Sequence, residues 1–182
     1  MKKATGTAPK LSTETSAGNE FTFYELFVTA LRETYWAENH LVKTLPVMRD
    51  AATHPKLKEA IAMHLGETEE QVTRLESIFS LLSEKPIAKK CIAVEGLAKE
   101  GESIIEMTGR TGPVCDLGII MANQKVEHYE IVAYDGLIQL ATSLGLPEVT
   151  EILNKTLEEE EKSDQKLNEI ALKHIVPQPS HT

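Results

Sequence analysis

Glu127 is the residue whose position in the sequence most strongly suggests chemistry. It lies within residues 114–144, where apolar side chains recur with the spacing of one long amphipathic helix. The apolar stripe of this helix comprises Leu117, Ile120, Gln124, Glu127, Ile131, Tyr134 and Ile138. A carboxylate in the middle of a buried stripe has to be protonated, ion-paired or bound to a cation, because burying an unpaired charge is costly.

Three further helical segments each place an acid on an apolar stripe, namely Glu38, Glu67 and Glu160. Each of the four acids falls near the middle of its helix. Antiparallel packing of the helices would therefore bring the four carboxylates to the same level. Carboxylates that converge in a dry core repel one another strongly, and bound divalent cations would remove this repulsion. We therefore predict a metal site at the centre of a helical bundle.

Nearby side chains extend the set of candidate ligands. His64 precedes Glu67 by three residues, so both can face the same point, and Glu130 and Asp164 lie one turn beyond Glu127 and Glu160. An oxygen-rich site with an imidazole suits iron or manganese, and a bridging carboxylate is typical of dinuclear centres. The predicted metal ligands are Glu38, His64, Glu67, Glu127, Glu130, Glu160 and Asp164.

His128 is not among these predicted ligands, although it is adjacent to Glu127. Successive residues of a helix point about 100° apart, so His128 faces away from the site that Glu127 faces. Gln71 and Gln124 lie on the apolar stripes and are candidates either for orienting ligands or for ordinary packing.

The ends of four long helices are marked by familiar signals. A capping box at Thr22 opens the first helix, and prolines suited to a first helical position (Pro55, Pro113, Pro147) open the other three. Gly145 is a typical residue to follow the end of the third helix. The sequence therefore predicts an all-α protein, built as an up-down four-helix bundle.

Residues 87–107 form a weaker amphipathic segment between the second and third long helices. Gly96 and Gly101 weaken this helix by roughly 1 kcal/mol each relative to alanine. We interpret the segment as a crossover helix rather than a member of the bundle, because a long connection at this point is a known variation of four-helix bundles.

The length of 182 residues suits one domain with a sizeable core. Residues 1–20 are rich in Thr, Ser, Ala, Gly and Lys and predict a flexible tail, residues 21–176 the helical domain, and residues 177–182 a C-terminal tail.

Composition argues against two classes of partner and indicates a compartment. The formal charge is −9, with the acids spread along the chain, whereas a nucleic-acid-binding protein needs a basic patch. No apolar run approaches the length of a membrane span. Cys91 and Cys115 lack a Cys-x-x-Cys spacing, so we expect reduced, structural cysteines and a cytoplasmic protein.

At the candidate ligands the chain resembles the DUF892, or YciF/YciE-like, family of the ferritin-like superfamily. The resemblance covers about residues 21–175 and is carried by Lys125-Val126-Glu127-His128-Tyr129-Glu130-Ile131, His64-Leu65-Gly66-Glu67-Thr68, Thr156-Leu157-Glu158-Glu159-Glu160 and Asp164. It implies a ferritin-like bundle that forms a homodimer, a dinuclear metal centre and a part in stress responses.

One departure from the ferritin-like pattern concerns the reaction. Di-iron proteins of this kind usually supply Glu-x-x-His from two helices, and this spacing occurs nowhere in the sequence. Instead, His64 precedes Glu67 in the reverse order, and Asp164 follows Glu160 by four residues. A metal-dependent oxidase or peroxidase activity therefore does not follow from the resemblance.

Two alternatives remain open from the sequence. In the first, Arg32, Lys43 or Lys125 neutralises the acids through buried salt bridges, and the protein is a metal-free, stress-related interaction module. In the second, the chain is a small iron-storage protein, which would require assembly into a large shell.

Overall fold

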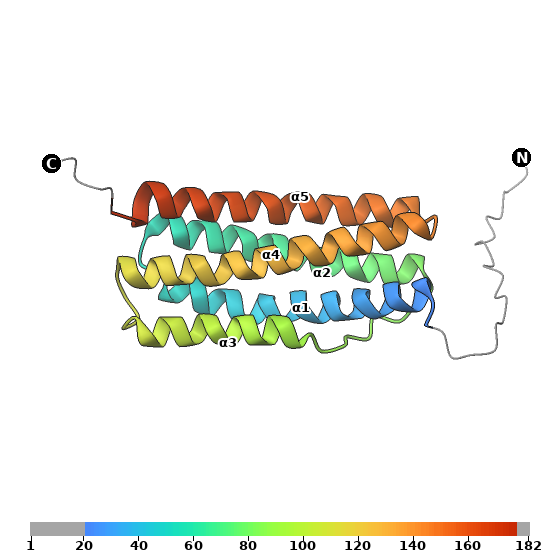
Figure 1. Ribbon diagram of the computed structural model, residues 1–182, viewed down its shortest axis with the longest axis horizontal. Coiled ribbons are helices and arrows are strands. Elements are labelled where there is room, and N and C mark those ends of the chain that lie inside the picture. The colour runs from blue at the N-terminus through green and yellow to red at the C-terminus, as the bar shows by residue number, and fades with distance from the viewer. Residues whose placement is uncertain (1–20, 178–182) are drawn as a thin grey trace, which may run out of the picture.

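The chain folds into α-helices arranged as an elongated bundle (Figure 1). The structure, a computed structural model, describes residues 21–177, and that part of the chain contains no β-strand. Its elements are α1 (Phe23–Ala51), α2 (Pro55–Leu81), α3 (Ile92–Met107), α4 (Pro113–Ser143), α5 (Pro147–Ile170) and a short π-helix, η1 (Ala171–Ile175). The all-α prediction is confirmed for these residues. The predicted tail 1–20, and the predicted C-terminal tail after Pro177, lie outside them.

The predicted start signals occupy the observed helix ends. The Thr22 hydroxyl accepts a hydrogen bond from the Glu25 backbone N–H at 3.1 Å, and the Glu25 carboxylate accepts one from the Thr22 N–H at 2.8 Å. Helices α2, α4 and α5 each begin with the expected proline, whose missing N–H is not needed at that position. None of the helices described is long and apolar enough to cross a membrane.

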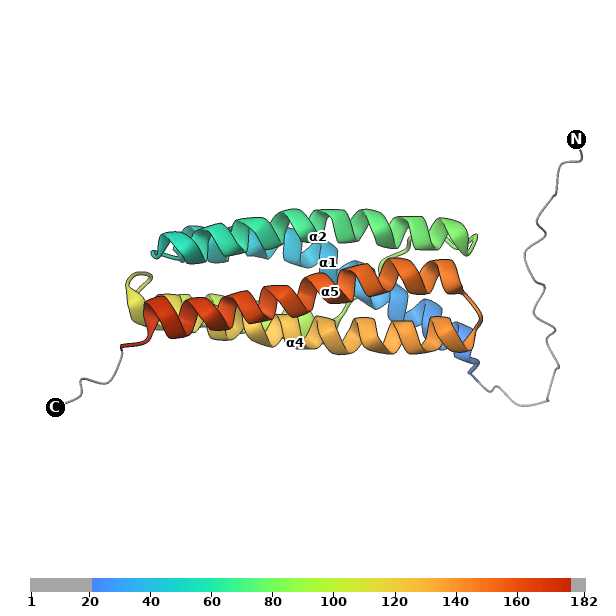
Figure 2. The same cartoon turned by 90° about the horizontal axis from the view of Figure 1, so that it is seen from above.

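Four long helices surround a common axis, and α3 lies outside them. Helix α1 packs against α2 and α4, and α5 packs against α4 and α2, while α3 contacts α1 and α4 (Figures 1 and 2). Neighbouring long helices run antiparallel (Figure 1). The crossover segment begins later than predicted: residues 87–91 are not helical, and α3 starts only at Ile92, after Cys91 has capped it.

The bundle contains two apolar clusters separated by a buried polar layer. One cluster includes Leu45, Ile61 and Ile119, and the other includes Leu31, Phe79 and Leu137. Buried polar side chains interrupt the apolar stripe of each long helix between the two clusters, and they are Thr34, Glu38, His64, Thr68, Gln71, Glu127, Glu130, Thr156, Glu160 and Ser163. Apolar packing therefore closes both ends of the polar layer.

Asp116 and Gly118 of α4 determine how closely α4 packs against the α1–α2 connection and against α3. The buried Asp116 carboxylate, in the first turn of α4, accepts hydrogen bonds from the Thr53 N–H and hydroxyl, both at 2.6 Å, and from the His54 N–H at 3.0 Å. It thereby ties the α1–α2 connection to α4. Gly118 brings α3 close to α4, because a Cβ at this position would lie 2.4 Å from Cγ2 of Ile104.

Candidate metal centre

The buried polar layer brings four potential ligands together on three helices. His64 comes from α2, Glu127 and Glu130 come from consecutive turns of α4, and Glu160 comes from α5. One ligand atom from each of the four lies within 4.8 Å of the other three. All four side chains are at most 4% exposed. The group is almost entirely shielded from solvent and offers three carboxylates and one imidazole.

Glu38 contributes a fourth carboxylate from α1, just outside this group. It is completely buried and accepts a hydrogen bond of 2.5 Å from the hydroxyl of Tyr134. Its charge acts on Glu130 and is itself affected by Glu160, so the carboxylates form one electrostatic cluster. All four long helices therefore supply polar groups to the same level of the bundle, as the equal depth of the acids predicted.

Three neighbouring side chains hold the carboxylates in position. The Gln71 side-chain amide donates to Oε1 of Glu160 at 2.5 Å and to Glu159 at 3.3 Å. The Ser163 hydroxyl donates to Oε1 of Glu127 at 3.0 Å. These contacts leave one oxygen of each carboxylate free toward the interior, and the hydroxyl of Tyr134 does the same for Glu38.

Burial opposes ionisation of every acid in the cluster. It raises the pKa of Glu127 to about 8, with a further contribution from the Asp164 carboxylate. Burial, followed by repulsion from Glu160, raises the pKa of Glu38. Burial and then the neighbouring carboxylates raise the pKa of Glu130, and burial is also the main cause of the raised pKa of Glu160. Without a cation, the cluster must therefore retain protons near neutral pH.

In the part of the chain that the structure describes, lysine and arginine side chains do not neutralise the four buried carboxylates. Arg32 pairs with Glu84, Lys125 pairs with Glu100, and Lys43 is exposed. Within residues 21–177, no lysine or arginine forms an ion pair with any of the four buried acids. The buried salt bridges of the metal-free alternative are thus absent from the part of the chain that the structure describes.

Unpaired atoms in the layer fit a bound metal. Both ring nitrogens of His64, both oxygens of Glu130 and one oxygen each of Glu38, Glu127 and Glu160 are buried with no hydrogen-bond partner. Nε2 of His64 lies 3.4 Å from Oε1 of Glu127. Buried polar atoms are nearly always paired, so this concentration of unpaired acceptors at one point requires protons or a cation. The three carboxylates and the imidazole could therefore hold a metal ion.

Two predicted ligands lie at the edge of the site rather than inside it. Glu67 is half-buried, and the neighbouring Thr68 takes the fully buried position on α2. Asp164 is also half-buried, accepts a hydrogen bond from the Gln124 amide at 3.0 Å and lies 3.4 Å from Nε2 of His128. As expected, His128 points away from the four-residue group, and its side chain is 69% exposed.

Two supporting residues were not identified from the sequence. Ser163 follows Glu160 by three residues, a spacing that could have indicated a shared helix face. The sequence places Tyr134 on the apolar stripe, where both a core position and a position near the centre are possible, and only the tertiary structure brings its hydroxyl to Glu38 on another helix. Gln71 and Gln124, in contrast, were recognised as candidates for orienting ligands.

Comparison with known proteins agrees with this architecture. Residues 22–178 match a family described as a domain of unknown function, DUF892. The chain is 38% identical to the protein YciF of Escherichia coli K12 over 158 residues, which is 86% of this chain and 95% of that protein. The crystal structure of the E. coli stress protein YciF superimposes with a TM-score of 0.80, covering 83% of this chain and 95% of that one. YcfI of Rhodopseudomonas palustris superimposes with a TM-score of 0.77 at 36% identity, covering 85% and 98%.

Proposed function

The chain belongs to the DUF892 family, and from this premise we propose that it is a ferritin-like metalloprotein with a carboxylate-rich iron or manganese centre. One observation carries the proposal: ligand atoms of His64, Glu127, Glu130 and Glu160 lie within 4.8 Å of one another in a buried layer. Since the related YciF is described as a stress protein, we place the function in a bacterial stress response.

The arrangement of the side chains supports a dinuclear centre. Neither oxygen of Glu130 accepts a hydrogen bond from a side chain outside the cluster of acids, so this carboxylate would be available to both ions of a dinuclear centre. His64, Glu127, Glu130 and Glu160 would hold the metal, and Glu38 would supply a further carboxylate beside them. Bound iron or manganese would supply redox chemistry with dioxygen or peroxide. The protein would contribute ligands, fixed by Gln71, Ser163 and Tyr134, and a pocket from which bulk water is excluded.

Metal content tests this function directly. The full-length protein is purified without chelator, incubated anaerobically with iron(II) or manganese(II), desalted and analysed by mass spectrometry of the metal. A dinuclear centre predicts about two ions per chain. Glu127→Ala should abolish binding because it removes a buried ligand. The control, Glu158→Ala, should bind like the wild type, because Glu158 is 69% exposed and pairs only with Lys162.

The alternatives predict different results. A wild-type protein that stays metal-poor after this treatment contradicts the proposal and favours a metal-free interaction module with a protonated carboxylate core. We expect a cytoplasmic homodimer, and sedimentation of the loaded protein separates this assembly from the large shell that iron storage would need. Catalysis is then tested on the loaded protein with peroxide as the oxidant.

A further inference from the structure

Asp164 links the surface of the bundle to the buried centre. It lies on α5, directly after Ser163, whose hydroxyl donates to Glu127 at 3.0 Å. Its own side chain is 24% exposed, whereas that of Glu127 is 1% exposed. The charge of Asp164 acts on Glu127, whose Oε2 is buried and has no hydrogen-bond partner. Asp164 is therefore a partly exposed carboxylate close enough to act electrostatically on a buried carboxylate of the centre.

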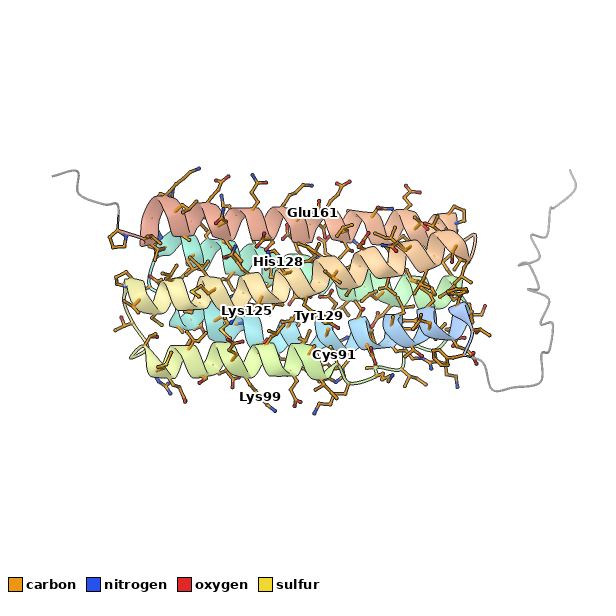
Figure 3. All side chains as sticks on the ribbon, in the orientation of Figure 1. Cys91, Lys99, Lys125, His128, Tyr129 and Glu161 are labelled. Atoms are coloured by element: carbon orange, nitrogen blue, oxygen red, sulfur yellow. The ribbon has the colours of Figure 1, made fainter. Side chains whose placement is uncertain are left out.

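Two polar side chains of α4, His128 and Gln124, contact Asp164 at the surface of the bundle. Nε2 of His128 is 3.4 Å from Oδ2 of Asp164, and the Gln124 amide donates to Oδ1 at 3.0 Å. Figure 3 shows His128 on α4 beside the seam between α4 and α5. Lys125, the basic neighbour on α4, pairs with Glu100 of α3 and does not oppose a cation at Asp164.

The seam between α2 and α5 is less suited to admitting a cation. Arg74 lies there with a side chain only 13% exposed, and its guanidinium contacts both oxygens of Glu159. Glu159 in turn accepts a hydrogen bond from Gln71, which holds Glu160 of the centre. The Arg74 guanidinium therefore occupies this seam and keeps the Glu159 carboxylate in an ion pair, so Glu159 is not available to a cation.

We propose that Asp164 and His128 form a surface docking site where a divalent cation binds before it passes to the buried centre. The carboxylate supplies a hard oxygen ligand and the imidazole a nitrogen ligand, a pair suited to iron(II) or manganese(II). The half-buried charge of Asp164 attracts the cation. Docking then replaces part of the cation's hydration shell before it reaches Glu127. This inference rests on the proposed metal-binding function.

Loading kinetics test the proposal. Metal-free full-length protein is mixed rapidly with manganese(II), and the fluorescence of Trp36, the only tryptophan in the chain, reports binding. Calorimetry gives affinity and stoichiometry. Asp164→Asn keeps an oxygen that can accept from Gln124 but removes the charge. We expect about tenfold slower association, because a focusing charge accelerates encounter by this order. Release should slow as well, the stoichiometry should not change, and the association rate should depend less on salt.

Two further variants make the result decisive. Glu161→Gln removes an exposed acid from the same helix, one turn from Asp164, and should leave the rate unchanged, because its charge is screened by solvent. His128→Ala, at a side chain 69% exposed and therefore dispensable for folding, should also slow association. Wild-type rates in both Asp164→Asn and His128→Ala overturn the proposal. So does faster release with lower affinity in Asp164→Asn, which would make Asp164 a ligand of the centre itself.

Failure of the proposed function has a separate signature. If the wild type takes up no manganese or iron at equilibrium, the centre does not bind metal, and the kinetic comparison has no signal to follow. If the wild type binds metal and only the rates are insensitive to Asp164 and His128, the function stands and the docking site is wrong.

Discussion

The protonation of Glu127 and its neighbours decides how the centre behaves with and without metal. Burial raises the pKa of Glu127 to about 8 and raises the pKa values of Glu38, Glu130 and Glu160. The metal-free protein therefore keeps protons on buried acids near neutral pH. A cation has to displace these protons, so metal binding should release protons and weaken as the pH falls.

The same pKa shifts predict an unusual dependence of stability on pH. Below about pH 4.5, Glu127 is protonated in both the folded and the unfolded chain, so it does not make the stability depend on pH. Between about pH 4.5 and 8 the unfolded chain releases the proton while the folded protein keeps it, so the stability of metal-free protein should fall as the pH rises. The slope is about 1.4 kcal/mol per pH unit for each retained proton, and it should vanish above the folded pKa.

Urea denaturation of metal-free protein between pH 5 and 9 measures this slope. The matched variant is Glu127→Gln, which keeps the shape of the side chain but cannot ionise, and its stability should fall less steeply over the same range. Equal slopes in the two proteins would show that Glu127 titrates normally in the folded state.

Helical periodicity predicted the burial of most of the acids in the site, but it did not predict which of two adjacent residues of α2 is buried. The stripes correctly predicted that Glu38, Glu127 and Glu160 are buried, and Glu130 followed from its place one turn after Glu127. On α2 the same reasoning predicted Glu67 on the stripe, whereas the structure buries the adjacent Thr68. Adjacent positions differ by about 100° around a helix, so the rotation of α2 against its neighbours decides between them, and the sequence of one helix does not contain that rotation.

At the scale of elements, glycines determine how α3 approaches the bundle. From the sequence, Gly101 could only be read as a weakness in a helix, yet a Cβ there would lie 2.3 Å from the terminal carbon of Met48 on α1. Gly118 has a similar close contact with the branched side chain of Ile104. These contacts join residues on different helices, so local propensity alone could not reveal their role.

Two alanine substitutions on α4 should therefore have opposite effects. Gly118→Ala should destabilise the protein by about 1–3 kcal/mol, because the stiff side chain of Ile104 has to move. Gly136→Ala, which meets no atom within 4 Å, should stabilise it by about 0.5–1 kcal/mol through better helix propensity. Chemical denaturation measures both. A stabilising Gly118→Ala would mean that α3 does not pack as closely as described.

The contact between α4 and the α1–α2 connection gives a second prediction at this scale. Asp116→Ala should cost about 3 kcal/mol of unfolding free energy, because two backbone donors and a hydroxyl at Thr53 and His54 lose a charged acceptor. Asp135→Asn is the control, since Asp135 is exposed and contacts only Gln139 on the same helix. Equal stabilities of the two variants in a urea titration would contradict a role for Asp116 in holding the connection.

The connection between α2 and α3 was the least predictable part of the fold. The sequence indicated helix from residue 87, but α3 begins at Ile92. The Lys89 N–H donates to the Arg32 carbonyl on α1, and the Cys91 sulfur lies 3.0 Å from the Tyr129 hydroxyl on α4. Contacts with two other helices thus keep this segment extended, and they outweigh the local preference for helix.

At the scale of the whole molecule, the polar layer divides the core in two and makes stability depend on its occupant. Metal-free protein holds its acids together at a cost in free energy, whereas a bound cation removes the repulsion between them. The equal depth of the acids along their helices predicted this layer. Its closure at both ends by apolar clusters became visible only once the helices were packed.

Thermal denaturation with and without metal tests this dependence. Metal at about 100 times its dissociation constant stabilises the folded state by about 2.7 kcal/mol, which corresponds to a rise of about 5–10 °C in the melting temperature of a chain of this size. Manganese(II) should produce this shift in the wild type and in Glu158→Ala, and none in Glu127→Ala. A rise in Glu127→Ala as large as in the wild type would indicate binding elsewhere on the protein.

The bond between Asp116 and the first helical connection also constrains the order in which the chain can fold during synthesis. Thr53 and His54 are made early, but their acceptor is residue 116 of 182, so the α1–α2 hairpin leaves the ribosome with its turn untied. The turn stays untied until the first turn of α4 has been translated. The hairpin also carries Glu38 and His64 while their partners on α4 and α5 do not yet exist. The nascent half-bundle therefore presents an open, hydrated acid and imidazole, and the dry centre forms only when the last helix closes over them.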